Sequence, residues 1–107
     1  MSVDVKSIAL PAFQTGTFTS AGSPALVTET IGYQPSLVIL YAATAATNPN
    51  MFVKAAIDPT KTMKTNGADG VVTSPADASG ILITATGFTV AAAAQTASGL
   101  NMWIAFR

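Results

Sequence analysis

Turn-forming residues divide this chain at short, fairly even intervals, and this spacing limits the fold more than any other feature. Clusters of Gly, Pro, Asn, Asp and Ser stand at 20–24, 32–35, 48–50, 58–59, 66–70 and 74–80. The segments between them are rich in Val, Ile, Thr, Phe and Tyr, which favour extended strands. None shows a convincing amphipathic-helix periodicity. The pattern therefore predicts an all-β fold.

We expect about seven to nine short strands that pair into an antiparallel β-sandwich of jelly-roll-like character. Residues 1–107 are expected to form one domain, because the length is near the usual size of a single domain and no linker divides the chain. Gly16 lies inside the second predicted strand, which suggests a bulge or bend there. The predicted strands cover 3–8, 13–19, 25–31, 36–41, 51–57, 61–65, 71–73, 80–90 with a break at Gly87, and 100–106.

Two segments are assigned to the core. The stretch 36–41 is a continuous apolar run, which predicts the most buried strand, central in a sheet that is covered on both faces. A buried helix is the alternative, but the run is too short for one. In the last predicted strand, Met102, Ile104 and Phe106 lie on one face, and we assign that face to the core. The opposite face carries Asn101, Trp103 and Ala105.

Charged residues are scarce, at 9% of the chain where about 25% is usual. Five Lys and Arg balance five Asp and Glu, so the formal net charge is zero. A lone monomer with so few charges is poorly protected against association, so we expect partners to cover part of its surface. The alternative is a monomer whose surface is solvated by small polar residues. Most of the charges fall between Lys54 and Asp77, and we expect this section to form a solvent-facing rim.

The chain contains no Cys and no His, which removes the usual nucleophilic thiol, catalytic base and soft metal ligands. We therefore expect no enzymatic activity and no cofactor. Asp58, Asp69 and Asp77 stand in turn-like sequence, where Asp usually accepts turn hydrogen bonds. Asn66 and Asp69 could offer oxygen ligands to Ca²⁺, but the ligand pattern of a calcium loop is absent, so a turn is favoured.

Binding to nucleic acid or to a membrane is not expected either. The balanced charges leave no basic stripe that would contact a phosphate backbone. The charge-free stretch 78–106 is long enough to span a bilayer, but polar residues and glycines interrupt it, so no membrane helix is predicted. Residues 1–6 carry charge and lack an apolar region, so no signal peptide is predicted.

Three aromatic residues offer the only recognition chemistry in the sequence. Tyr33 stands in a turn, Tyr41 ends the apolar run, and Trp103 lies opposite the face assigned to the core. An exposed Tyr or Trp can stack on a sugar or anchor a protein partner. These three residues are therefore candidate contacts for a partner or receptor. The alternative for Trp103 is that it fills the core of the sandwich, and this reading is favoured.

Four segments, taken in order, resemble small β-sandwich modules of tailed-bacteriophage virions. Such modules have a TG-x-F start, a GF-x-P-x-hydrophobic strand, a GFTV strand and a terminal W-I-A-F strand. The last strand is also similar to the final strand of H-type lectin modules, but the polar sugar-contacting residues of those lectins have no clear match here. The segments are 13–19 (FQTGTFT), 27–40 (VTETIGYQPSLVIL), 87–90 (GFTV) and 103–106 (WIAF).

The resemblance implies two roles. The first is a capsid decoration or cement protein, typically a trimer, that binds the assembled major capsid protein on the exterior of the virion after synthesis in the host cytoplasm. The second is a fibre or spike tip that binds a host receptor or glycan. A start at Met1 and the lack of a coiled-coil or stalk segment favour decoration. A charge-poor surface also suits an interface whose buried centre is depleted in charge.

Overall fold

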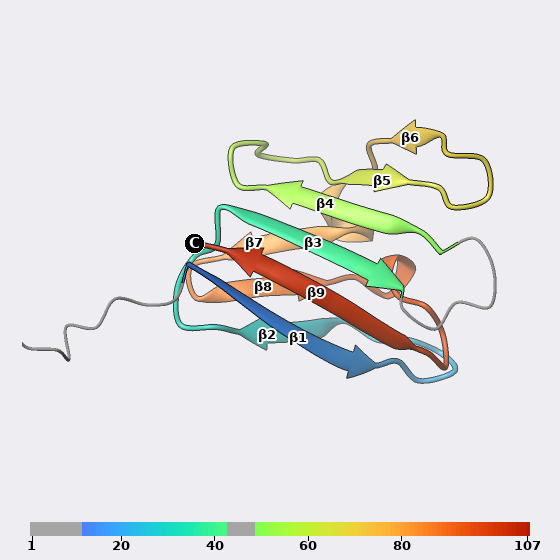
Figure 1. Ribbon diagram of the computed structural model, residues 1–107, viewed down its shortest axis with the longest axis horizontal. Helices are drawn as coiled ribbons and strands as arrows, with labels where there is room; N and C mark the ends of the chain where they lie inside the picture. Colours follow the sequence, from blue (N-terminus) through green and yellow to red (C-terminus); the bar gives the residue numbers. More distant parts are fainter. Residues whose placement is uncertain (1–11, 43–48) are drawn as a thin grey trace, which may run out of the picture.

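The computed structural model describes residues 12–42 and 49–107, which form two antiparallel sheets (Figure 1). The larger sheet has six strands in the order β1-β9-β3-β4-β5-β6, and the smaller has three in the order β2-β8-β7. The prediction of an all-β, antiparallel β-sandwich is confirmed. The strand expected at 3–8 lies outside the described residues.

The strands fall within or next to the predicted segments. A tight turn joins β7 to β8, and Gly87, where a break was expected, is the first residue of β8. Within residues 12–42 and 49–107, two single 3₁₀ turns lie in the connections: η2 (Asp77–Ser79) and η3 (Ala92–Ala94). The strands of the larger sheet are β1 (Phe13–Thr19), β9 (Leu100–Phe106), β3 (Leu37–Ala42), β4 (Met51–Ala55), β5 (Met63–Thr65) and β6 (Val72–Thr73); those of the smaller are β2 (Val27–Thr30), β8 (Gly87–Val90) and β7 (Ile81–Thr84).

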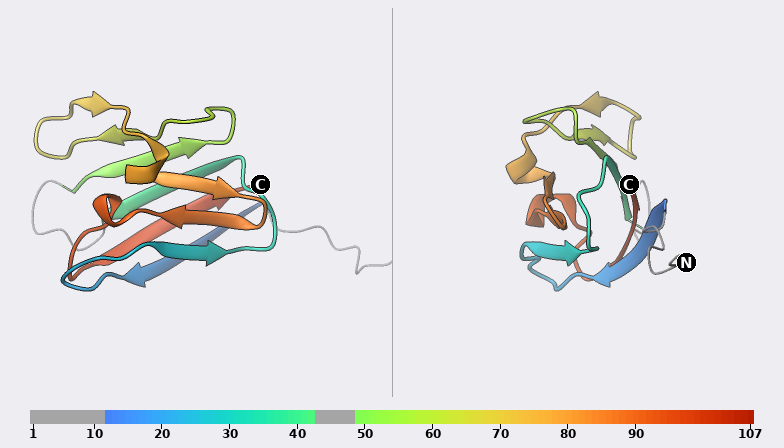
Figure 2. Two further views of the ribbon diagram at one scale, coloured as in Figure 1. Left: turned by 180° about the vertical axis from the view of Figure 1, so that it is seen from behind. Right: turned by 90° about the vertical axis from the view of Figure 1, so that its left-hand side faces the viewer.

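The hydrophobic core lies between the two sheets, with the smaller sheet covering one face of the larger (Figure 2). Trp103 of β9 meets Phe88 of β8 edge to face, with ring centroids 5.1 Å apart. Such a T-shaped pair is a favoured aromatic geometry. The fully or almost fully buried core residues come from both sheets and include Val38, Leu40, Phe52, Ile81, Phe88, Val90 and Ala105.

The expectation that β3 is covered on both faces is wrong. Val38 and Leu40 point into the core and are buried, whereas Ile39 is only partly buried and Tyr41 is 43% exposed. The strand is central in its sheet, between β9 and β4, but only the inner face of that sheet is covered by the smaller one. A continuous apolar run therefore marks here a strand whose uncovered face is also apolar.

The face of β9 that was assigned to the core is also wrong. Trp103 and Ala105 are buried, together with Asn101, whereas Met102 is 46% exposed. Asn101 is tolerated inside because its amide group is satisfied. Its Nδ2 donates to Ser20 Oγ at 2.9 Å, and its Oδ1 accepts the Thr96 backbone N–H at 3.0 Å. A hydrogen-bonded polar residue thus occupies the inner face, and an apolar residue occupies the outer one.

Gly16 does not produce the expected bulge or bend. β1 pairs with β9 residue for residue, from Phe13 opposite Phe106 to Thr19 opposite Leu100. The glycine instead makes room for its cross-strand neighbour Trp103. A Cβ at position 16 would overlap the indole ring, so the absence of a side chain allows the ring to lie against the backbone of β1.

Gly87 permits a close approach between strands of the smaller sheet. It pairs with Thr30 of β2 and Thr84 of β7, and a Cβ here would overlap the backbone carbonyl oxygen of Glu29. Gly87→Ala is therefore expected to lower the free energy of unfolding by about 3 kcal/mol. Denaturant titration followed by circular dichroism would measure the loss. Gly22→Ala is the control, because its Cβ would meet only Ser98 Oγ at 3.4 Å. An equal loss in both variants would contradict the expectation.

Candidate functional site

The outward-facing side of the six-stranded sheet forms an apolar surface, which we call the outer face. Side chains of alternate residues in five adjacent strands stand opposite one another because the antiparallel register aligns them. They form three rows across the sheet. The rows are Phe13, Phe106, Leu37 and Ala55; Thr15, Ile104, Ile39, Val53 and Met63; and Thr17, Met102, Tyr41, Met51 and Thr65.

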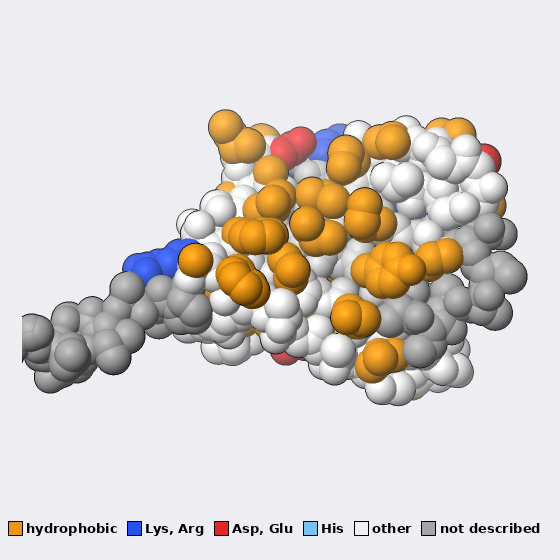
Figure 3. Space-filling model, viewed as in Figure 1, with side chains coloured by type: hydrophobic (Ala, Val, Ile, Leu, Met, Phe, Trp, Pro, Cys, Tyr) orange, Lys and Arg blue, Asp and Glu red, His pale blue; other side chains and the backbone are white. Residues whose placement is uncertain are grey.

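The outer face is uncharged. Its three rows contain only aliphatic, aromatic, methionine and threonine side chains, and in Figure 3 the charged side chains lie at the margins of the apolar area. Large apolar side chains are nevertheless exposed on it: Phe13 by 52%, Met63 by 42% and Met51 by 38%. Contiguous exposed apolar surfaces of this kind mark interaction sites in folded proteins. The outer face is therefore the candidate functional site.

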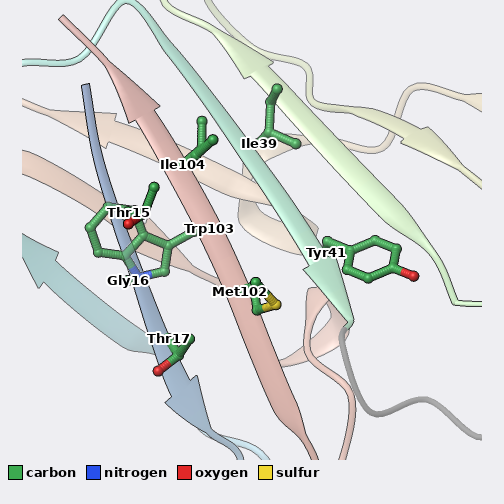
Figure 4. A pocket seen from close by; sticks show the side chains of 8 residues that line it. All are labelled: Thr15, Gly16, Thr17, Ile39, Tyr41, Met102, Trp103 and Ile104. Carbon is green, nitrogen blue, oxygen red and sulfur yellow. The ribbon is translucent and has the colours of Figure 1, made fainter. Parts of the chain in front are cut away.

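A hollow of about 280 Å³ opens on the outer face between β1, β9 and β3 (Figure 4). Gly16 contributes no side chain, and the neighbouring Thr15 and Thr17 are short, whereas longer side chains surround them on β9 and β3. The hollow is thus a consequence of small residues on β1. Its lining consists of Thr15, Gly16, Thr17, Ile39, Tyr41, Met102, Trp103 and Ile104.

The three predicted contact residues do not share one exposed surface. Tyr33 is buried, and its hydroxyl donates to the backbone oxygen of Ala105 at 3.4 Å. Trp103 is also buried, as the favoured interpretation expected, although it is among the residues that line the hollow. Tyr41 alone is exposed. Figure 4 shows the rings of Tyr41 and Trp103 on opposite sides of β9.

Most residues of the outer face were missed by the sequence reasoning. Ile39 and Met102 were assigned to the core because an apolar residue in a strand is usually buried. The outer face could have been predicted by considering two predicted strands together. Both 36–41 and 100–106 carry apolar residues at successive positions, so a sheet covered on one side must leave some of them outside.

Lys54 is the centre of a buried polar cluster. Its Nζ donates to the backbone oxygens of Asp58 and Lys61, at 2.5 and 3.0 Å, and to a carboxylate oxygen of Asp77 at 3.0 Å. The other carboxylate oxygen of Asp77 accepts the Thr62 hydroxyl proton at 3.0 Å. All three protons of the ammonium group have acceptors. The cluster joins β4 to the β4–β5 connection and to the first residue of η2, and offers no free group for chemistry.

The expectation of a solvent-facing charged rim is wrong for two of its members. The side chains of Lys54 and Asp77 are only 3% and 11% exposed. They can be buried because the ammonium group of Lys54 and the carboxylate of Asp77 neutralise each other, so the usual penalty for an unpaired buried charge does not arise. Asp58, Lys61 and Asp69 are exposed as expected.

Asp58 organises the turn after β4. Its carboxylate accepts the backbone N–H groups of Lys61 at 2.9 Å and Thr60 at 3.1 Å. These two bonds hold the pKa of Asp58 below its ordinary value of 3.8, and the bond from Lys61 is the larger cause. A carboxyl with a lowered folded-state pKa stabilises the fold above its unfolded pKa, and this contribution is lost as the pH falls through the folded pKa.

Asp58→Asn is therefore expected to change the pH dependence of stability. Asn keeps an oxygen acceptor for both N–H groups but carries no charge. The melting temperature of the wild type should exceed that of the variant by a constant amount above about pH 5, and the difference should shrink toward about pH 2. Thermal denaturation of both proteins across this range would measure it. A difference that stays constant down to the lowest pH would contradict the assignment.

Asn66 and Asp69 form turns, as the favoured reading expected. Asn66 Oδ1 accepts the Ala68 N–H, and Asp69 Oδ1 accepts the Val71 N–H, both at 3.0 Å. In the described parts of the chain, no group of three or more Asp and Glu side chains lies close enough to hold a metal ion. Among the same residues, no helix has the length and apolar character needed to cross a bilayer.

Comparison of the chain with models of protein families, with curated proteins and with solved structures finds no match.

Proposed function

We propose that this chain is a non-enzymatic structural protein of a bacteriophage virion, most specifically a decoration protein that binds the assembled major capsid lattice from outside. The resemblance of four segments to virion modules supports this proposal. The observation that carries it is the outer face, an uncharged apolar surface on a chain with few charges anywhere. In an assembly, neighbouring subunits would cover this apolar surface, whereas in a monomer it would be exposed to water.

The exposed apolar side chains of the outer face favour association. Burial of apolar area stabilises an association by about 25 cal/mol per Å², less the entropic cost of joining the partners. The centre of a permanent interface is depleted in charge and enriched in aromatic residues and Met. The outer face has this composition, with Phe13, Tyr41, Met51 and Met102 exposed on it. On this proposal, the protein is synthesised in the host cytoplasm and then held in the virion by surface of this kind.

Co-sedimentation would test the proposal directly. Shells would be assembled from the major capsid protein of the phage whose genome encodes this chain, and the purified chain would be added in increasing amounts. We expect saturable binding to assembled shells, little binding to unassembled capsid protein, and a higher melting temperature for decorated shells. A chain that stays in the supernatant at every ratio would refute the decoration role.

A fibre or spike tip that binds a receptor or glycan is the second candidate. One observation favours it: Tyr41 is exposed next to the hollow, where an aromatic ring can stack on a sugar. Apart from the indole N–H of Trp103, the polar side-chain groups that line the hollow are the hydroxyls of Thr15, Thr17 and Tyr41, so few groups could orient a sugar. A glycan array would test this candidate, with Tyr41→Ala as the informative variant. Hits that Tyr41→Ala abolishes would support it, and an array without hits would count against it.

A further inference from the structure

The outer face reaches the minimum size of a specific protein interface. Five strands, β1, β9, β3, β4 and β5, cross it at intervals of about 4.8 Å, and successive rows follow at about 6.7 Å along the strands. The face therefore measures on the order of 500 Å² before the relief of the side chains is counted. Two such faces in contact bury about 1,000 Å², which reaches the lower bound for a specific interface.

The lack of charge favours an identical partner. In a two-fold pair the same surface patch meets itself, so any net charge on the patch would repel its own copy. The three rows contain no charged side chain, so this penalty is absent. A different protein is usually selected through complementary charge, and the outer face offers none for that purpose. The surface that best matches an apolar, neutral sheet face of this size is a second copy of it.

The relief of the outer face is complementary to itself. On the β1 side, Thr15 and Thr17 are short and border the hollow. On the β4 and β5 side, Met51 and Met63 project and are exposed. Methionine side chains are flexible and fill irregular spaces well. In the second and third rows, the β1 side of the face is therefore low and the β4 and β5 side is high.

From these three observations we propose that a second copy of the chain covers the outer face, in a dimer whose two-fold axis runs along β3, the middle strand of the five. Rotation about this axis lays β1 of one copy over β5 of its partner, and β9 over β4. Met51 and Met63 of each copy then face the hollow of the other. The two larger sheets stack about 10 Å apart, as the sheets of a sandwich do. The inference rests on the proposed function only in that both require the outer face to be covered; in the dimer the second copy covers it, so a capsid lattice would contact other surfaces of the dimer.

Light scattering coupled to size-exclusion chromatography would measure the predicted dimer. The wild type should have twice the chain mass of 10.8 kDa. Met102 lies on β9, one strand from the proposed axis, so Met102→Lys places two like charges about 10 Å apart along the sheets in a desolvated interface. Its dimer should dissociate at least about tenfold more readily. Leu82→Lys is the matched control, because Leu82 is 48% exposed on β7 of the smaller sheet, against 46% for Met102. This control should remain dimeric.

Cross-linking would test the orientation of the two copies. The chain has no Cys, so an introduced cysteine is its only thiol. In the proposed dimer, Thr17 of one copy faces Thr65 of the other, whereas the two Thr17 positions lie about four strand spacings, roughly 19 Å, apart along the sheets. A short bis-maleimide should therefore link Thr17→Cys to Thr65→Cys in a co-purified mixture. Neither variant alone should give a linked product.

Each remaining outcome is decisive. A wild-type monomer, a trimer of the kind that the resemblance implies, or a dimer that persists in a folded Met102→Lys variant would overturn the two-fold inference. Circular dichroism would establish that both lysine variants are folded. A linked product from Thr17→Cys alone would overturn the axis. A monomer that still binds shells would refute this inference and leave the decoration role intact, whereas a dimer that ignores shells would do the reverse.

Discussion

Lys54→Met is expected to lower the free energy of unfolding by about 3–5 kcal/mol, because removing one partner of a buried ion pair leaves the other uncompensated. Met keeps the length and most of the volume of the lysine stem, so the loss reports the ammonium group. The Asp77 side chain is only 11% exposed, and in the variant its carboxylate would keep only the Thr62 hydroxyl as a donor. Two backbone oxygens, those of Asp58 and Lys61, would lose their partner as well.

Denaturant titration followed by circular dichroism would measure this loss. Lys64→Met is the matched control, because Lys64 lies on the adjacent strand β5 with its ammonium 5.7 Å from the centre of the Phe52 ring. This cation–π contact contributes about 1 kcal/mol or less to the free energy of unfolding at an accessible site. Adding Asp77→Asn to Lys54→Met should recover only part of the stability, since the two backbone oxygens stay unpaired. Equal losses for Lys54→Met and Lys64→Met would show that the buried pair is not the cause.

Trp103→Ala should lower the free energy of unfolding by about 3–5 kcal/mol, the usual range for removing a large aromatic side chain from a core. The ring is buried, meets Phe88 edge to face and fills the space left by Gly16. Trp103→Phe should cost much less. The indole Nε1 is buried without a hydrogen-bond partner among the described residues, and removing such a donor offsets part of the lost packing.

The same contact predicts a coupling between Gly16 and Trp103. Gly16→Ala should destabilise the wild type, because the added Cβ overlaps the indole, but should be tolerated far better in Trp103→Phe, whose smaller ring has no such atoms. A double-mutant cycle measures this difference as an interaction free energy. Losses that simply add would refute the proposed reason for the glycine. The cycle should be followed by circular dichroism, since Trp103 is the only tryptophan and its variants lack its fluorescence.

The strands themselves were predictable, but the direction in which their side chains point was not. Turn residues punctuate the chain clearly, and every described strand lies within one residue of a predicted segment. Alternation identifies the buried face only when the other face is polar. In β9 that contrast is reversed, because Asn101 is buried with satisfied hydrogen bonds while Met102 is exposed. Hydropathy therefore assigned the wrong face of β9 to the core.

The buried ion pair and the tight glycine contacts were also out of reach of the sequence. Lys54 and Asp77 are 23 positions apart and come together only through the tertiary fold. Nothing local distinguishes Lys54 from a lysine that faces solvent. Gly16 and Trp103 are even further apart, so a close approach could be suspected at the glycine but its partner could not be named. The outer face likewise depends on which strands become neighbours.

The position of β9 has a consequence for how the molecule forms. β9 lies between β1 and β3 and is the strand through which β1 joins the rest of the larger sheet. Phe13 pairs with Phe106, so this contact closes a loop spanning almost the whole sequence. Loop closure of this length slows folding, because entropy is lost before the contacts form. Until β9 has been synthesised and inserted, β1 lacks the one described strand that pairs with it, and the edge of β3 that pairs with β9 is open. A nascent chain therefore passes through a stage with exposed strand edges that a chaperone could protect.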